Sequence, residues 1–234
     1  MKSCKYYFQN GQTVQTEEAV RRVRIIEKML SYDVRTAIWS HTVMEASNRI
    51  IPPGLIGFET QFNHTYQGIH SALAIKLTMD ISRIFDTSNK NKHPREKQDK
   101  ASVQVLGALI IRKDVQTELL REDNNRKIAI DEFVNTSQKT DVPGSEEQMA
   151  LKRVRDIRTS RLAHSLFDEV PDQEPFYKDL NLLLGIAIQA ANYAAMAIRG
   201  ENGDFDLDVE YDYENAEKYF IATLGGLQAA INQA

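Results

Sequence analysis

The chain has 234 residues, a net charge of −4 at pH 7, and 42% hydrophobic and 26% charged residues. This length fits one large domain or two small ones, and the apolar share is sufficient for a core. The acidic balance excludes a globally basic nucleic-acid-binding protein, so any such binding requires a local patch. The single cysteine, Cys4, excludes an internal disulfide and a cysteine-based zinc site.

Nothing in the sequence predicts export or a membrane span. The residues after Met1 lack the apolar core of a signal peptide. No run of about 18 apolar residues occurs, which is the length that a spanning helix needs. We therefore expect a cytoplasmic protein without membrane contact.

The first two predicted elements are long helices. Apolar residues recur three and four positions apart from Thr16 to Ile51, and the two prolines and glycine at 52–54 predict the end of this helix. A second apolar stripe predicts a helix over residues 61–86. The polar and basic residues 87–97 lack periodicity, which predicts a surface loop.

The middle of the chain also has a helical pattern. A third helix is predicted to begin near Ala101, and a further helical stretch over 127–134 is compatible with its continuation. Residues 141–145 contain Pro-Gly and break the pattern. Ser145 followed by Gln148 resembles a capping box, which predicts that a new helix begins there.

This helix is predicted to end near Phe167, and residues 178–198 are the most apolar helical stretch, expected at the centre of the core. Residues 203–213 alternate between acidic and apolar side chains, which predicts an extended strand whose apolar face packs on the bundle or on a partner. A last helix is predicted to follow from Glu214.

The fold class that these elements predict is all-α, a bundle of long helices with one short extended acidic segment near the C-terminus. No linker or internal repeat divides the chain, so we expect a single domain over residues 1–234. Its core is placed at about 15–200, the extended acidic arm at 201–213 and the C-terminal helix at 214–232.

Positive charge is concentrated in the predicted helix that ends near Phe167. Such a local field attracts phosphate, although composition alone favours the alternative of a solvated face paired with acidic neighbours. Against one acidic residue, Asp156, this stretch carries Lys152, Arg153, Arg155, Arg158 and Arg161.

His164 follows these cations and is flanked by apolar residues. Histidine titrates close to neutral pH, so it serves either as a satisfied core group or as a general acid or base. Around a helix, Arg161 lies about 60° from His164 and Arg158 about 120°. Helical spacing alone therefore does not choose between the two arginines as its partner.

Arg158, followed by the polar Thr159 and, after five intervening residues, by His164, resembles the signature of the HEPN superfamily of helical ribonucleases. Residues 157–164 are similar to its abortive-infection (AbiU-like) branch. Residues 80–86, Asp-Ile-Ser-Arg-Ile-Phe-Asp, are similar to the upstream pattern of that branch. Thr159 stands where the family typically has asparagine or another strong hydrogen-bonding group.

The resemblance implies a HEPN-like endoribonuclease of a defence or toxin system, which cleaves RNA through the 2′-hydroxyl without a metal or cofactor. It implies a homodimer and, as a further partner, an antitoxin or another defence-system protein. The alternatives are a non-catalytic HEPN-like module that binds RNA or a nucleotide, a subunit of a larger defence complex, and a plain helical scaffold. The implied catalytic residues are Arg158 and His164, and the RNA-binding or supporting residues are Thr159, Arg161, Arg155, Asp80 and Arg83.

Asp80 and Arg83 are three positions apart on the second predicted helix. This spacing predicts an ion pair within the helix. The alternative is that one of the two faces the cleft and orients His164 or the RNA, and the spacing leaves both possibilities open.

Overall fold

The computed structural model describes residues 14–54, 61–87, 94–159 and 177–231. Within these ranges the chain is all-α and contains no strand, as the sequence predicts. The α-helices of this part of the chain are α1 (Thr16–Gly54), α2 (Gln61–Ile84), α3 (Val103–Ile110), α4 (Lys113–Glu122), α5 (Lys127–Gln138), α6 (Glu146–Ile157), α7 (Tyr177–Arg199) and α8 (Phe205–Ile231).

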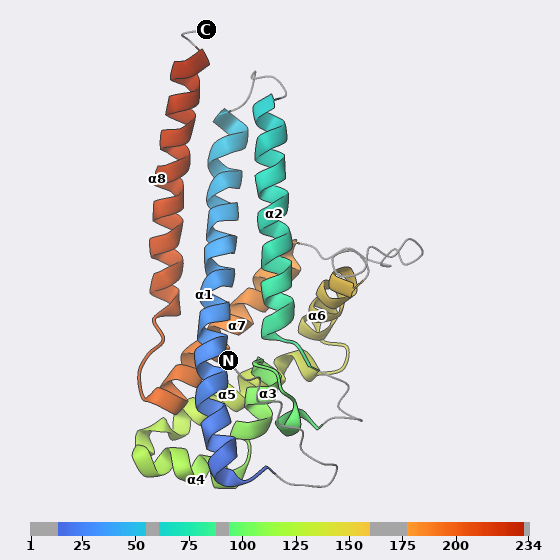
Figure 1. Ribbon diagram of the computed structural model, residues 1–234, viewed down its shortest axis with the longest axis vertical. Helices are drawn as coiled ribbons and strands as arrows, with labels where there is room; N and C mark the ends of the chain where they lie inside the picture. Colours follow the sequence, from blue (N-terminus) through green and yellow to red (C-terminus); the bar gives the residue numbers. More distant parts are fainter. Residues whose placement is uncertain (1–13, 55–60, 88–93, 160–176, 232–234) are drawn as a thin grey trace, which may run out of the picture.

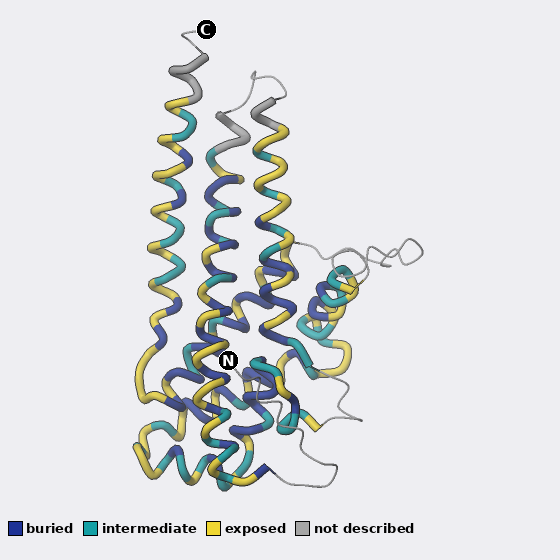
Figure 2. Tube along the Cα trace, in the orientation of Figure 1, coloured by how far each residue is buried: buried dark blue, intermediate teal, exposed yellow. Residues whose placement is uncertain are grey.

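Three long helices form one half of the molecule. Helix α1 lies between α2 and α8 and packs extensively against both (Figure 1). The short helices α3 and α4 pack with α7 against α1, while α5 and α6 pack on α7 and α6 also contacts α2. Burial follows this arrangement, since buried residues are dense where α7 crosses α1 and sparse along the outer ends of α2 and α8 (Figure 2).

Most of the buried apolar side chains belong to one cluster, to which all eight of these helices contribute. The aromatic rings of Phe85, Phe133 and Phe205 are fully buried in it. Helix α7 packs against α5, α1, α6 and α2, so its predicted place at the centre of the core is confirmed.

Helix α7 is also the one helix of the described residues that could cross a membrane by length and composition. Of its most apolar window, 56% is buried inside the protein. Its packing against neighbouring helices accounts for its apolar composition, as in the core helix of a soluble protein.

The start of α6 follows the predicted capping pattern. The Ser145 hydroxyl accepts a hydrogen bond from the Gln148 backbone N–H at 3.1 Å. In return, the Gln148 side-chain oxygen accepts from the backbone N–H of Gly144 at 2.8 Å, one residue before the position that a standard capping box uses. Two backbone donors at the helix start are therefore satisfied by side chains.

Replacing Ser145 with alanine removes one of these acceptors, and we expect the free energy of unfolding to fall by about 1 kcal/mol. Ser145→Asp keeps an acceptor at the same position and should preserve stability. Urea denaturation of both variants measures the change. Equal midpoints for Ser145→Ala and the wild type would contradict a capping role.

The strand predicted over 203–213 is wrong, because α8 begins at Phe205 and continues through this segment. An alternating pattern also places apolar residues four positions apart, and Phe205 and Val209 use that spacing to pack into the main cluster. Leu207 and Tyr211, on the apolar face of the predicted strand, are exposed. The acidic first turn suits a helix N-terminus, and Asp208 also pairs with Arg35 of α1 at 2.8 Å.

Candidate active site

The C-terminal end of α6 lies against the C-terminal end of α2. Arg158 and Thr159 extend α6 in a π-helical turn. The Arg158 Nη1 donates to the Ser82 Oγ at 3.3 Å and lies 3.6 Å from the Asp86 Oδ1. Ser82 lies in the last turn of α2 and Asp86 lies two residues after its end, so both are placed where the end of α2 meets α6. The two sequence segments that carry the family resemblance are thus in direct contact through Arg158.

Arg158 is only partly engaged by these contacts. Both use Nη1, and its Nε and Nη2 have no partner among the described residues. Its side chain is 36% exposed, and Asp86 also accepts a hydrogen bond from Lys100 at 2.8 Å. A planar guanidinium with spare donors and solvent access can approach a phosphate oxygen.

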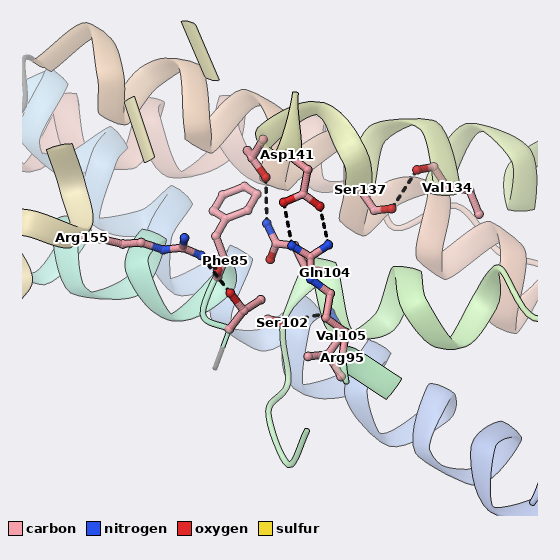
Figure 3. Close-up of polar contacts among 11 residues, drawn as sticks. Phe85, Arg95, Ser102, Gln104, Val105, Val134, Ser137, Asp141 and Arg155 are labelled. Carbon is pink, nitrogen blue, oxygen red and sulfur yellow. Dashed lines mark hydrogen bonds and ion pairs between the residues drawn. The ribbon is translucent and has the colours of Figure 1, made fainter. Parts of the chain in front are cut away.

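Arg155 fastens α6 to the end of α2. Its Nη2 donates to the Phe85 carbonyl, and Figure 3 shows Arg155 pointing toward Phe85. The same Nη2 lies 3.5 Å from the Thr87 hydroxyl. Helix C-termini leave carbonyl groups without intrahelical donors, and this arginine satisfies one near the end of α2. Burial lowers the pKa of Arg155, although a guanidinium stays charged at any physiological pH. Through these contacts Arg155 fixes the end of α6 on the end of α2, and thereby supports the position of Arg158.

The hydroxyl of Thr159 points back into its own helix. Its Oγ1 donates to the Arg155 carbonyl oxygen at 2.9 Å, one turn earlier. The one proton of this hydroxyl is therefore used within the helix, whereas an asparagine amide at this position has two donors. Thr159 is exposed but has no described contact with Arg158.

Asp80 and Arg83 form the ion pair that their spacing predicts, at 3.1 Å. Arg83 also pairs with Asp33 of α1 at 2.9 Å, and Lys76 pairs with Asp80 at 2.5 Å. Burial raises the pKa of Asp33, while the charge of Arg83 opposes that shift. These residues connect α2 to α1, and the described contacts do not bring them to Arg158.

Other cations of α6 are paired with acids, as the alternative based on composition predicts. Arg153 makes two hydrogen bonds to Asp179 of α7, at 2.8 and 2.7 Å. Lys152 is exposed and lies 3.9 Å from Asp156 on the same helix. Of the four described cations on α6 and its extension, Lys152 has the longest ionic contact, at 3.9 Å, but pairs within its own helix, whereas Arg158, 3.6 Å from Asp86, lies where two helices meet.

Sequence reasoning did not assign a role to Ser82 or Asp86. Both lie inside the 80–86 segment, four positions apart, and their place in that segment was the available signal. Two of the predicted site residues, Arg161 and His164, lie outside the described residues. Within the described part of the chain, no group of three or more histidine, cysteine, aspartate or glutamate residues is placed to hold a metal ion.

Comparison with known proteins adds no relative. No family model, curated protein or solved structure matches this chain.

Proposed function

We propose that this chain is a metal-independent endoribonuclease of the HEPN type that acts in a defence or toxin system. The observation that supports the proposal is the contact of Arg158 with Ser82 and Asp86. Those residues join two segments far apart in the sequence, 80–86 and 157–164, which are the two that resemble the family.

In the proposed reaction, the RNA 2′-hydroxyl attacks the adjacent phosphorus. The O2′–P bond forms, the P–O5′ bond breaks, and a 2′,3′-cyclic phosphate and a 5′-hydroxyl result. His164 takes the 2′-proton or gives a proton to the departing O5′, and its counterpart in a second copy performs the other transfer. Arg158 stabilises the charge that develops on the phosphate oxygens.

Cleavage of RNA in EDTA tests this chemistry directly. We expect purified protein to cut RNA into fragments that end in a cyclic phosphate, and to leave an oligonucleotide intact where the 2′-hydroxyl next to the cut is replaced by hydrogen. His164→Ala protein, purified in the same way, detects any contaminating nuclease. Cleavage that requires a divalent metal, or that persists in the 2′-deoxy substrate, contradicts the proposal.

A second candidate function is RNA binding without cleavage, by the chain itself or as a subunit of a larger defence complex. The hydrogen bond from Thr159 to the Arg155 carbonyl favours it, because that proton is not available to a substrate phosphate. Salt-sensitive RNA binding by both the wild type and His164→Ala, with no cyclic-phosphate product from either, distinguishes this function from catalysis.

A further inference from the structure

A groove of about 660 Å³ lies at the other end of the molecule, where α2 and α8 flank α1. Figure 1 shows these three helices side by side with α1 in the middle. Trp39, Val43 and Ser47 form its floor on α1, Leu73 is on the α2 wall, and Phe220 is on the α8 wall. None of the described residues of the proposed ribonuclease site lines it.

The groove has the dimensions of a small-molecule site. Its floor runs from Trp39 to Ser47, which corresponds to about 12 Å along a helix. Its volume falls within the range of roughly 300–1,000 Å³ that is usual for ligand pockets. A docked helix from a second protein normally uses a longer seam, with several turns of anchoring residues.

Aromatic side chains from all three helices line the groove. Trp39 is 48% exposed, although it is large and apolar. Tyr66 faces it from α2, and Tyr219 and Phe220 line the α8 side, where their rings meet edge to face with centroids 5.3 Å apart. Aromatic faces carry negative electrostatic potential, so several around one space attract a cation as well as an apolar body.

Among the described residues, Asp212 of α8 is the one charged side chain that lines the groove, and no basic residue lines it. Its carboxylate has no hydrogen-bond or ion-pair partner among the described residues. Burial raises the pKa of Asp212, and the charge of Asp208 acts in the same direction. The half-buried carboxylate therefore carries a desolvation cost that a bound cation can offset.

We propose that this groove binds an organic ammonium ion with an apolar body. Arg35 of α1 pairs with Asp208 of α8, and Trp39 and Asp212 each follow one helical turn later, so these two lie at the same level of the groove. The ammonium group pairs with Asp212 and with the face of the Trp39 ring, and the apolar body lies along Val43 and Leu73. Charge complementarity selects this class of ligand. An anion would be repelled by the Asp212 carboxylate, and a neutral ligand would leave the negative charge of Asp212 uncompensated.

The chain has a single tryptophan, Trp39, so its intrinsic fluorescence reports occupancy of the groove. The probes are octyltrimethylammonium, 1-octanol and octanoate, each below its aggregation concentration. We expect the ammonium ion to change Trp39 emission saturably and to bind about tenfold more tightly than octanol, with octanoate weakest. Octanol or octanoate binding as tightly as the ammonium ion would overturn the proposal, and so would an absence of saturable binding.

Two variants of α8 distinguish binding in the groove from general attraction of the cation to surface charge. Asp212→Asn keeps the side-chain shape and should remove the preference for the ammonium ion over octanol. Glu210→Gln makes the same change of charge at an exposed position outside the groove and should retain the preference. An unchanged preference in Asp212→Asn would overturn the proposal.

The remaining occupant to test is a second copy of the chain. If the emission of Trp39 changes with protein concentration in the absence of ligand, and the mass measured by light scattering changes with it, a copy covers the groove and the ligand proposal fails. We expect the emission of Trp39 to be independent of protein concentration, including over any range in which two copies associate at the ribonuclease site and the mass changes. None of these measurements depends on ribonuclease activity, so failure of one proposal would not count against the other.

Discussion

His164→Ala is expected to lower the rate of RNA cleavage by about 10² to 10⁴-fold, which is the usual contribution of a general acid or base. The side chain is the titrating group of the proposed pair, and alanine cannot move a proton. His64→Ala is the matched control, because His64 is an exposed histidine of α2 with no part in the proposed site. Initial rates in EDTA and far-UV circular dichroism of both variants measure the effect and verify the fold.

Arg158 provides a companion test of the same site. Arg158→Ala should reduce cleavage by about 10²- to 10³-fold, because it removes donors from the developing phosphate charge. Its partly exposed contact with Asp86 is expected to contribute at most about 1 kcal/mol to stability, so the lost activity cannot arise from unfolding. Wild-type rates in both His164→Ala and Arg158→Ala would show that these residues do not catalyse the reaction.

Local patterns in the sequence predicted the helices well. Helix α1 begins at Thr16 and α2 at Gln61, both as predicted. The helix predicted near Ala101 is divided, because α3 ends at Ile110 and α4 begins at Lys113. Apolar periodicity predicts which residues are buried but does not show a short interruption between two helices that keep a similar pattern.

The acidic segment shows where local reasoning fails. A period of two contains a period of four, so the spacing of Phe205 and Val209 is compatible with both a strand and a helix. The contact with α1 decides between them, since one helical face of α8 reaches the core. Sequence alone does not show that contact.

The sequence predicted part of the candidate site, as it predicted part of the fold. The motif selected Arg158, which does contact the upstream segment. Helical spacing gives only the relative directions of side chains, so it could not show that Ser82 and Asp86 face α6 while Asp80 and Arg83 pair toward α1. Which face of α2 meets which helix is a property of the tertiary packing.

The ion pair between Arg153 and Asp179 holds α6 on α7, and Asp179→Ala is expected to lower the free energy of unfolding by about 3–5 kcal/mol. Asp179 is 1% exposed and Arg153 12% exposed, so water cannot replace the missing carboxylate readily. Their two hydrogen bonds, at 2.8 and 2.7 Å, are parallel and charge-assisted, and Asp179 raises the pKa of Arg153. The substitution leaves a buried guanidinium without that partner.

Urea denaturation of Asp179→Ala measures this loss, and Asp131→Ala is its control. Asp131 pairs with Lys127 at 2.7 Å with both side chains 53% exposed, so its removal should cost less than about 1 kcal/mol. Replacing both members of the buried pair with apolar residues, Arg153→Met with Asp179→Leu, should recover most of the stability. A loss below 1 kcal/mol for Asp179→Ala would contradict this role.

Because α6 also carries Arg155 and Arg158, a loosened α6 should reduce cleavage by misplacing Arg158, and the apolar double variant should restore both stability and cleavage.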